Sequence, residues 1–326
     1  MTKARVVSLD KLGGADVIQV IDKELPPPAK GEVQIRQTAI GFNFIDIYQR
    51  SGFYPLELPT GLGHEAVGVV ESLGEGVTGL KVGDRVMYMN AGIGAYASAR
   101  NVAADKLVPV PDNVSDEVAA AVFFKAMTAQ YLVQKTYKVK AGDIVLVHAA
   151  AGGVGQILAG WAKGLGAFVV GTVGSQAKVA AAKAAGCDAV VDYSNANWVE
   201  EVLKATGGKK ANVVYDSVAK DTFLGSLDCV APFGTLALFG AASGPAPEIQ
   251  PEILNKKGCL FLTRPSVFPH NATHALLQEN AKAVFDAIAK GYVKVQIGAK
   301  FPLEQAADAH RAAEGRKVSG AIVMIP

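Results

Sequence analysis

The sequence predicts an α/β protein of two domains, one built on a doubly wound parallel sheet and the other on an irregular β-barrel. Three observations lead to this prediction. The chain has 326 residues, which is more than a single hydrophobic core usually serves. Its middle part alternates strand-like and helix-like segments, which is typical of βαβ units. Its first part instead holds short strand-like segments that glycine and proline turns separate.

The composition indicates a globular protein and excludes several classes of function. Half of the residues are hydrophobic and 19% are charged, so disorder is not expected. Lysine and arginine number 32 against 30 acidic residues, without a block of like charge, so we expect no nucleic-acid partner. The N-terminus has no signal-peptide pattern, and no apolar run is long enough to span a membrane. We therefore expect a cytoplasmic protein without membrane association.

The first domain is expected to form from short strands with turns between them. Pro26–Pro28 and Gly61–Gly63 are the main breakers in this part of the chain, and they leave strand-like runs of about the usual length for an all-β fold. The alternation therefore favours an irregular β-barrel. The expected strands are residues 4–9, 31–36, 65–70 and 84–88.

From Ser115 the pattern becomes alanine-rich and helical, and strands and helices then alternate as in a parallel sheet. The alternation ends at Arg264-Pro265. A long helix, 275–290, follows, and the closing strand, 320–325, is more like the opening segments than the middle ones. We expect the first domain to comprise residues 1–122 and 267–326 and the second residues 123–266. The expected strands of the second domain are 143–148, 168–173, 189–192, 213–216, 235–239 and 260–263.

The three cysteines, Cys187, Cys229 and Cys259, are widely separated, and each lies in an apolar stretch. Such spacing does not indicate a disulfide framework. Each is expected to be a small buried hydrophobic residue.

A glycine-rich turn between the first strand and helix of the second domain predicts dinucleotide binding. Strand 144–148 runs into Ala149-Ala150-Ala151-Gly152-Gly153-Val154-Gly155 and then into helix 156–163. Gly152 and Gly153 would let the backbone approach a pyrophosphate, Gly155 would let the helix pack closely on the sheet, and the amides at the helix start would face the phosphate charge. Ala150 replaces the first glycine of the usual motif, but the strand-turn-helix context favours a Rossmann domain.

The choice of nicotinamide cofactor is read after the second strand of such a domain. An NAD enzyme places a carboxylate there, about 20 residues beyond the glycine turn. This chain has Gly174-Ser175-Gln176-Ala177-Lys178 instead, and a hydroxyl and a cation suit a 2′-phosphate. The segment therefore favours NADPH over NADH, although Lys178 as an ordinary solvated helix residue remains the alternative.

With this fingerprint, the turn 83–86 and the segment Gly61-Leu62-Gly63-His64-Glu65, the sequence resembles the medium-chain dehydrogenase/reductase superfamily. Within it the chain is similar, over essentially its whole length, to the NADPH:quinone oxidoreductase branch, the bacterial relatives of zeta-crystallin. The resemblance implies a GroES-like catalytic domain, a Rossmann domain that binds NADPH, a homodimer, and hydride transfer to a quinone substrate in an interdomain cleft. The segments that carry the closer resemblance are 43–52, 148–155, 214–218 and 263–266.

The resemblance also implies site residues. The catalytic set is Asn43, Asp46, Tyr48 and Tyr54, which would lie on the nicotinamide and substrate side. Two alternatives stay open: the tyrosines as half-buried members of the barrel, and Asp46 as a residue that only orients its neighbours. The residues expected to bind the cofactor are Asn43, Tyr48, Tyr131, Gly152, Gly153, Val154, Gly155, Gly174, Ser175, Lys178, Tyr193, Ser217, Phe239, Gly240, Ser243, Arg264 and Arg316.

No metal is expected, because the alcohol-dehydrogenase branch holds catalytic zinc with cysteine and histidine. The corresponding cysteine positions fall near Asn43 and within Phe123-Phe124-Lys125, which leaves His64 without thiolate partners. His64 and His148 are expected to be structural, and His270, His274 and His310, in polar surroundings, indicate no site. A quinone accepts an electron pair into a ring that becomes aromatic, so positioning the reactants can replace a Lewis acid.

Two other functions remain open at this point. An NADPH-dependent enone or alkenal reductase would use the same cofactor and cleft, and the sequence does not separate it from a quinone reductase. A non-catalytic NADPH-binding protein of the zeta-crystallin type, structural or RNA-binding, is the second alternative. The near-neutral charge and the absence of aromatic residues interleaved with basic ones speak against RNA.

Overall fold

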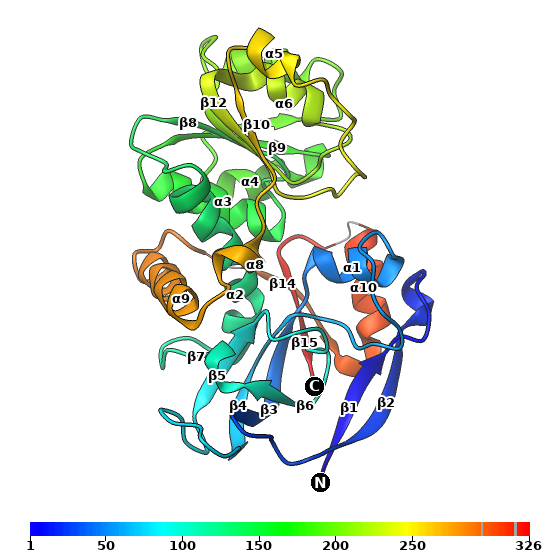
Figure 1. The fold of residues 1–326 in the computed structure, drawn as a ribbon. Coiled ribbons are helices and arrows are strands. Elements are labelled where there is room, and N and C mark those ends of the chain that lie inside the picture. Colours follow the sequence, from blue (N-terminus) through cyan, green and yellow to red (C-terminus); the bar gives the residue numbers. More distant parts are fainter. Residues whose placement is uncertain (295, 316–317) are drawn as a thin grey trace. The chain divides into compact units, whose positions relative to one another are not determined.

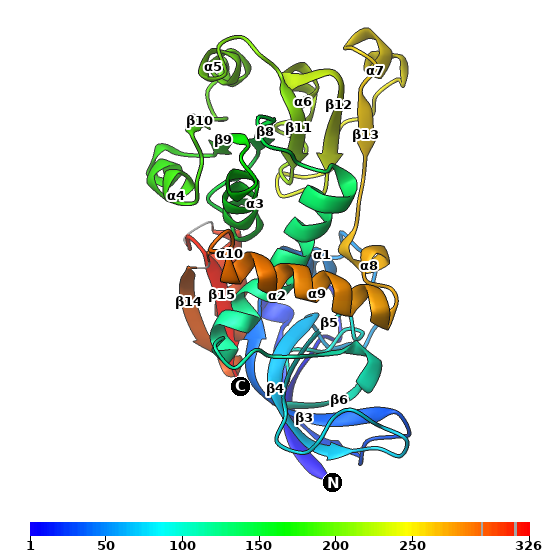
Figure 2. The same cartoon turned by 90° about the vertical axis from the view of Figure 1, so that its left-hand side faces the viewer.

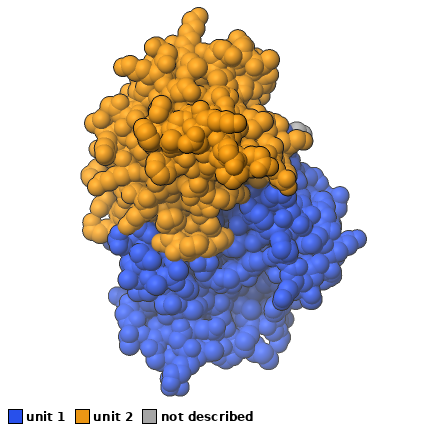
Figure 3. Space-filling view, turned by 45° about the horizontal axis from the view of Figure 1, so that its top comes forward, with its two compact units in different colours: residues 1–125, 271–281, 295–326 blue, residues 126–270, 282–294 orange. Residues whose placement is uncertain are grey.

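The computed structural model describes residues 1–294, 296–315 and 318–326, and the chain forms two compact units (Figure 1). Unit 1 consists of residues 1–125, 271–281 and 295–326, and unit 2 of residues 126–270 and 282–294. Figure 3 colours the two units separately. Two of the four divisions fall within helices, α2 (Asp116–Tyr131) and α9 (His274–Ala289), and the other two fall after residues 270 and 294.

Unit 1 is built around an irregular, mainly antiparallel sheet. Its strand order among the described residues is β14-β15-β3-β4-β5-β7, with β6 also paired to β3, and a separate ribbon joins β1 and β2. The register between β3 and β4 shifts twice, and such bulges bend and twist a sheet. The strands are β1 (Thr2–Ser8), β2 (Gln19–Leu25), β3 (Glu32–Gly41), β4 (Glu65–Leu73), β5 (Arg85–Met89), β6 (Ala99–Ala103), β7 (Leu107–Pro109), β14 (Ile297–Pro302) and β15 (Ala321–Ile325).

The helices that lie wholly within unit 1 are short. Helix α1 begins after Asn43 and ends at Gly52, whose left-handed backbone (φ 86°) suits glycine. Helix α10 buries Ala306 and Ala309 against the core that the strands form, so small residues allow the close contact. The helices are η1 (Ala15–Val17), α1 (Phe44–Ser51), η2 (Ala104–Lys106), η5 (Leu303–Gln305) and α10 (Ala306–Glu314).

Unit 2 confirms the predicted doubly wound parallel sheet. Its strand order is β10-β9-β8-β11-β12-β13, all parallel, which is the order of the Rossmann fold. Helices α3 and α4 lie on one face of the sheet and α5 and α6 on the other (Figure 2). The strands are β8 (Ile144–Val147), β9 (Phe168–Val173), β10 (Ala189–Asp192), β11 (Ala211–Asp216), β12 (Val230–Leu238) and β13 (Phe261–Thr263).

The central strand of unit 2 is buried on both faces, as helices on both sides of a parallel sheet require. Val145, Leu146 and Val147 of β8 are all 0% exposed. The continuous apolar run that predicted this strand is therefore explained by its position. The helices are η3, a π-helical turn (Leu132–Thr136), α3 (Gly153–Gly164), η4 (Gln176–Lys178), α4 (Val179–Ala184), α5 (Trp198–Ala205), α6 (Phe223–Cys229), α7 (Glu252–Lys256) and α8 (Val267–His270).

One expectation about the cysteines is wrong. Cys187 and Cys229 are buried as predicted, but Cys259 is exposed. It follows Gly258 in the turn between α7 and β13 and has a positive φ of 56°, so its side chain points away from the core although its neighbours in sequence are apolar. No helix in the described part of the chain has the length and apolarity to cross a membrane.

The packing of α3 generates a stability prediction. A Cβ on Gly160 would lie 2.6 Å from the backbone oxygen of Tyr292 and 3.2 Å from that of Ala185. We expect Gly160→Ala to lower the free energy of unfolding by about 1–3 kcal/mol, because overpacking against backbone outweighs the gain in helix propensity. Urea denaturation measures the change. In the control, Gly14→Ala, the new Cβ meets nothing within 4 Å, and an equal loss there would contradict the explanation.

Candidate functional site

The predicted nucleotide-binding residues that the structure describes in unit 2 lie at the carboxyl ends of its strands, apart from Tyr131 on α2. In open α/β sheets, ligands bind outside this edge, at the strand where the connections switch from one side of the sheet to the other. That strand is β8, which has β9 on one side and β11 on the other. Gly152–Gly155 follow β8, Gly174–Lys178 follow β9, Tyr193 follows β10, Ser217 follows β11, Phe239–Ser243 follow β12 and Arg264 follows β13.

The turn after β8 brings bare backbone to the start of α3. Gly152 caps the helix in an extended conformation, and a Cβ on Gly155 would lie 2.2 Å from the backbone oxygen of Ala149. Only glycine at 155 therefore lets the helix begin so close to the strand. The first amides of α3 have no partner within the helix, and they can receive a diphosphate.

The structure explains why Ala150 replaces the first glycine of the motif. The Ala150 side chain is 0% exposed, and a Cβ on Gly171 of the neighbouring β9 would lie 2.7 Å from its methyl carbon. The methyl group of Ala150 thus occupies space that Gly171 leaves open. The departure from the usual motif is compensated on the adjacent strand.

The segment after β9 forms the expected adenosine end of the site. A Cβ on Gly174 would lie 2.6 Å from the hydroxyl oxygen of Tyr193, so these two predicted residues are in contact. Ser175 precedes η4 in extended conformation, and Lys178 is half-buried and bonds through its backbone N–H to the Ser175 carbonyl at 3.1 Å. A hydroxyl and a cation, without a carboxylate in the segment, fit a 2′-phosphate.

Close packing and hydrogen bonds fix the loops that follow the last three strands, β11, β12 and β13. Gly240 packs on Ser217, since a Cβ would lie 2.5 Å from the Ser217 carbonyl oxygen. The Ser243 hydroxyl donates to the carbonyl of Val218 at 2.7 Å. The Arg264 guanidinium donates to the carbonyl of Leu238 at 2.9 Å.

Tyr131, also in unit 2, does not lie at a strand end. It is 2% exposed, and its ring stacks on that of His270 with the ring centroids 4.4 Å apart.

Beneath the turn, a buried polar network fixes His148, in agreement with its predicted structural role. The Ser226 hydroxyl donates to the Asp216 carboxylate at 2.9 Å, so it accepts from Nε2–H of His148 at 2.9 Å. Nδ1 then accepts from the Thr172 hydroxyl at 2.8 Å. Burial lowers the pKa of His148, which keeps the ring neutral. The sequence did not indicate Asp216 as the centre of this network.

In unit 1, two predicted catalytic residues are buried at the start of α1. Asn43 is 4% exposed and Asp46 is 0% exposed. The backbone N–H of Asn43 donates to Oδ2 of Asp46 at 2.9 Å, and the Tyr96 hydroxyl donates to the same oxygen at 2.8 Å. Burial raises the pKa of Asp46 to about 7, although these two hydrogen bonds act in the opposite direction. Among the described residues, Oδ1 has no hydrogen-bond partner.

A chain of side chains extends from Asp46 to the surface, and it corrects one expectation. His310 was not expected to belong to a site, but it is 0% exposed and lies between Tyr96 (3.3 Å) and Arg50 (3.2 Å). Arginine only donates, so Nδ1 of His310 accepts and Nε2 carries the proton. Burial lowers the pKa of His310 to about 3. Arg50 in turn makes a bidentate pair with Glu314 at 3.0 and 2.6 Å.

A second buried cluster joins Asn43 to a charge pair. The Asn43 side-chain amide donates to Glu65 at 2.8 Å, and Lys125 donates to Oδ1 of Asn43 at 3.2 Å and to Glu65 at 3.5 Å. Burial raises the pKa of Glu65, against the effect of the Lys125 ammonium. From the sequence, Lys125 was considered only as a position where a zinc enzyme would have cysteine. A lysine within the apolar helix pattern was the signal that was not used.

The predicted tyrosines form a half-exposed aromatic cluster. Tyr48 contacts Tyr54 with ring centroids 5.4 Å apart, and Phe44 and Phe53 lie 5.5 and 5.3 Å from Tyr48. Phe44 is 40% and Phe53 43% exposed, so the cluster presents apolar rings to solvent. Sequence reasoning named the tyrosines and missed the two phenylalanines, which lie one helical turn before Tyr48 and immediately before Tyr54.

His64 has an amide as its partner rather than thiolates. Its Nε2 lies 2.9 Å from Oε1 of Gln49, and burial lowers its pKa to about 4. Among the described residues there is no group of three or more histidine, cysteine, aspartate or glutamate side chains that could hold a metal ion.

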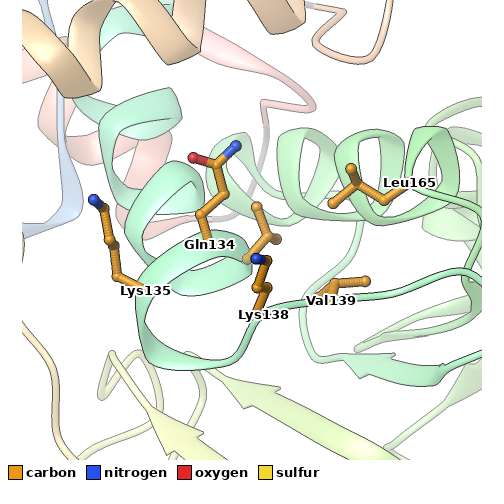
Figure 4. A pocket seen from close by; sticks show the side chains of 6 residues that line it. Gln134, Lys135, Lys138, Val139 and Leu165 are labelled. Carbon is orange, nitrogen blue, oxygen red and sulfur yellow. The ribbon is translucent and has the colours of Figure 1, made fainter.

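A surface hollow of about 280 Å³ lies elsewhere in unit 2 (Figure 4). It is lined by residues that precede β8 and β9, namely Val133, Gln134, Lys135, Lys138, Val139 and Leu165. These segments lead into the amino ends of the strands, opposite the edge where ligands bind in this fold. We therefore do not assign the cofactor to it. The predicted residue Arg316 lies outside the described residues.

Comparison with known proteins finds similarity over both units. Residues 29–112 match the model of the alcohol dehydrogenase GroES-like domain, and residues 153–290 match that of a zinc-binding dehydrogenase. The chain is 46% identical to a quinone oxidoreductase of Salmonella typhimurium (98% of this chain, 99% of the relative). It is 43% identical to a 2-haloacrylate reductase of a Burkholderia species (98% of each chain). The solved structure of Escherichia coli quinone oxidoreductase complexed with NADPH matches with a TM-score of 0.96 and 44% identity over 99% of this chain and 100% of that one.

The raised pKa of Asp46 generates a pH prediction. Because the folded state holds this proton up to about pH 7 and the unfolded state releases it near pH 4, folding binds a proton between these values. The contribution of Asp46 to stability therefore falls as the pH rises through this window, by at most about 4 kcal/mol. We expect the free energy of unfolding of wild type, relative to Asp46→Asn, to decrease from about pH 5 to about pH 8 in urea denaturation.

The exposed residue Asp10 provides the control. Asp10→Asn should show no such pH dependence relative to wild type. If the difference between wild type and Asp46→Asn stays constant with pH, Asp46 does not titrate in this window.

Proposed function

Because the chain belongs to the quinone oxidoreductase family of the medium-chain dehydrogenase/reductase superfamily, we propose that it is a zinc-independent NADPH:quinone oxidoreductase that reduces small quinones. The observation that carries the proposal is the placement of the predicted nucleotide residues along one edge of the unit 2 sheet, in a chain that matches these relatives over nearly its full length. The glycine turn, Ser175 and Lys178 fit the diphosphate and the 2′-phosphate of NADPH.

When bound, NADPH supplies a hydride to the substrate. Gly152, Gly153, Val154 and Gly155 would hold its diphosphate at the start of α3, where the backbone amides and the helix dipole favour negative charge. Ser175, Lys178 and Tyr193 would surround the adenosine phosphate. Tyr131, Ser217, Phe239, Gly240, Ser243 and Arg264 complete the proposed set.

On the side of unit 1, the chain would hold a flat acceptor. Tyr48 and Tyr54, with Phe44 and Phe53 beside them, offer ring faces and two phenol hydroxyls, and aromatic pairs favour stacked or edge-to-face contact with another ring. Asn43 and Asp46 fix the start of the helix that carries this cluster. Orientation of the acceptor and exclusion of water are then the main contributions of the protein.

The donor set supports chemistry that does not depend on zinc. His64 bonds to the Gln49 amide, and the other positions where a metal ligand would be expected hold Asn43 and Lys125, which bond to each other. An ammonium cannot act as a ligand while it is protonated, and a neutral amide is a poor zinc ligand.

A second candidate activity is the reduction of an activated alkene. The 2-haloacrylate reductase relative covers nearly the whole chain, and its name describes an activated alkene as substrate. Such a reaction would use the same cofactor edge. Nothing observed favours the alternative of a non-catalytic, structural or RNA-binding protein, and we do not propose it.

The proposal includes a cytoplasmic homodimer. Strand β13 is at the edge of the unit 2 sheet, and Phe261 on it is 62% exposed. An exposed apolar edge strand invites pairing with another strand. A second copy of the chain, related by a two-fold axis, could continue the sheet at this edge.

The activity is tested by steady-state oxidation of NADPH with 1,4-benzoquinone or a simple enone, and by reduction of NADP⁺ with a simple alkyl alcohol. Each assay is run before and after dialysis against a chelator. We expect turnover with the quinone, at least tenfold lower kcat/KM with the enone, none with the alcohol, and no effect of the chelator. Preference for the enone would replace the proposal with the alkene reductase. Activity that returns only when a divalent metal is added would overturn it.

Cofactor choice is tested at Lys178. We expect Lys178→Ala to weaken NADPH binding by roughly tenfold or more, since a charged hydrogen bond to the 2′-phosphate is lost, and to leave NADH binding unchanged. Quenching of protein fluorescence measures both affinities. The exposed Lys183 on α4 provides the control variant Lys183→Ala. Equal losses of NADPH and NADH in Lys178→Ala would show that this lysine does not contact the phosphate.

A further inference from the structure

Lys125 forms a buried cluster with Asn43 and Glu65, and among the described residues it is the cation of that cluster. The proposed mechanism gives it no role. Its side chain is 8% exposed and that of Glu65 1%, and Asn43 is 4% exposed. Burying an ammonium is unfavourable, and even a paired buried charge is often no more stabilising than an apolar residue of similar size. Stability alone therefore does not account for a lysine at position 125, beside Asn43.

The partners of Lys125 pair with its charge but do not occupy all of its hydrogen-bond donors. The ammonium has three N–H donors, and its contacts within the described residues are Asn43 Oδ1 at 3.2 Å and Glu65 Oε1 at 3.5 Å. The second distance is at the limit of a hydrogen bond. Glu65 is bound more tightly by other donors, the Asn43 amide at 2.8 Å and the backbone N–H of Phe124 at 2.7 Å. Within the part of the chain that the structure describes, at least one N–H of Lys125 thus has no acceptor and remains for another oxygen.

The neighbours also fix the orientation of the cluster. The Asn43 amide has Glu65 on its nitrogen side and Lys125 on its oxygen side. Exchange of the amide nitrogen and oxygen would place the oxygen against the carboxylate and the NH₂ group against the ammonium, so that orientation is excluded. Glu65 itself fits only because residue 41 is glycine, since a Cβ there would lie 2.2 Å from Oε1 of Glu65. The ammonium is therefore held in one place before any ligand arrives, which is the condition for electrostatic stabilisation of a developing charge.

We propose that Lys125 is a catalytic residue whose remaining N–H donates to the quinone oxygen that becomes negatively charged during reduction. The inference rests on the proposed function. The quinone gains a hydride, that is, one proton and two electrons, from NADPH, and becomes a hydroquinone monoanion. The ammonium stabilises this anion by charge and hydrogen bonding, and the second proton comes from solvent after release. NADPH is oxidised by two electrons and the quinone is reduced by two, so the step balances.

The experiment compares wild type with Lys125→Met and with the double variant Lys125→Met/Glu65→Gln. The double variant removes the ion pair as a whole, so that no carboxylate stays buried alone, and its thermal melting shows that it folds. Lys282→Met is the matched control, because Lys282 is 77% exposed. The substrates are chloro-, unsubstituted and methyl-1,4-benzoquinone, which are similar in size and give increasingly basic hydroquinone anions.

We expect kcat with methylbenzoquinone to fall roughly 100-fold in both Lys125 variants, as for the loss of one preorganised donor. With chlorobenzoquinone kcat should fall much less, because its less basic anion needs less stabilisation. The control should match wild type throughout. A structural role for Lys125 would lower the three rates by the same factor, and that result overturns the inference while leaving the proposed function intact. If wild type reduces none of the quinones, the proposed function fails as well.

A binding measurement gives a second, independent readout. 4-Nitrophenol, added to the enzyme saturated with NADP⁺, shows by its absorbance whether it is bound as phenol or phenolate. We expect wild type and Lys282→Met to lower the pKa of the bound phenol by at least one unit, and the Lys125 variants not to lower it. The same ionisation in all four proteins would overturn the inference.

Discussion

The parallel pairing of β8 with β9 and β11 is the constraint on which the proposed nucleotide site depends. Because every strand of the unit 2 sheet runs in the same direction, the segments that follow the strands reach the same edge, although they span more than a hundred residues of sequence. None of these segments needs its own binding fold. The hydrogen bonds of the sheet fix where each segment begins, so each segment has only to provide a glycine, hydroxyl or cation there. The glycine turn after β8 lies at the centre of that edge.

Unit 1 solves a different problem, which is to keep polar groups in place inside a β-rich core. Asp46, Tyr96, His310 and Arg50 form a line in which the direction of each hydrogen bond follows from the fact that arginine can only donate. The Asn43 amide links the start of α1 to the separate pair of Glu65 and Lys125. Buried polar networks of this kind are costly unless every member is satisfied, and here they converge on one helix N-terminus.

The sequence predicted the parts of the fold that follow from local patterns. The bounds expected for β9 and β10 agree with the structure, since continuous apolar runs between turns are typical of buried parallel strands. The strands β2, β6 and β7 were not predicted, and β14 was expected only as one of the short β pieces between the long helix and the last strand, without bounds. Half-exposed or very short strands have little periodicity and depend on pairing with distant segments. The same limit applies to the site.

The glycines and the hydroxyl-cation segment of the proposed site could be named from the sequence because one turn or one motif defines them, and their role stays a prediction. The contacts of Lys125 with Asn43 and Glu65, and the position of His310 between Tyr96 and Arg50, could not, because each joins residues that are far apart in the chain. His310 lies in a polar stretch of an amphipathic helix, and only its burial against β-strand residues shows that it faces inward. A single sequence, taken by itself, does not show which distant residues pair.

The exchange between Ala150 and Gly171 has a consequence for how this nucleotide turn can vary. A Cβ on Gly171 would lie 2.7 Å from the Ala150 methyl carbon and 2.5 Å from Sγ of Cys187, so two side chains exclude any larger residue at 171. Glycine at 150 would not by itself make room there, because the Cys187 thiol would still occupy the space. A larger residue at 171 therefore requires smaller residues at both 150 and 187, which couples the nucleotide turn to a cysteine that lies outside it.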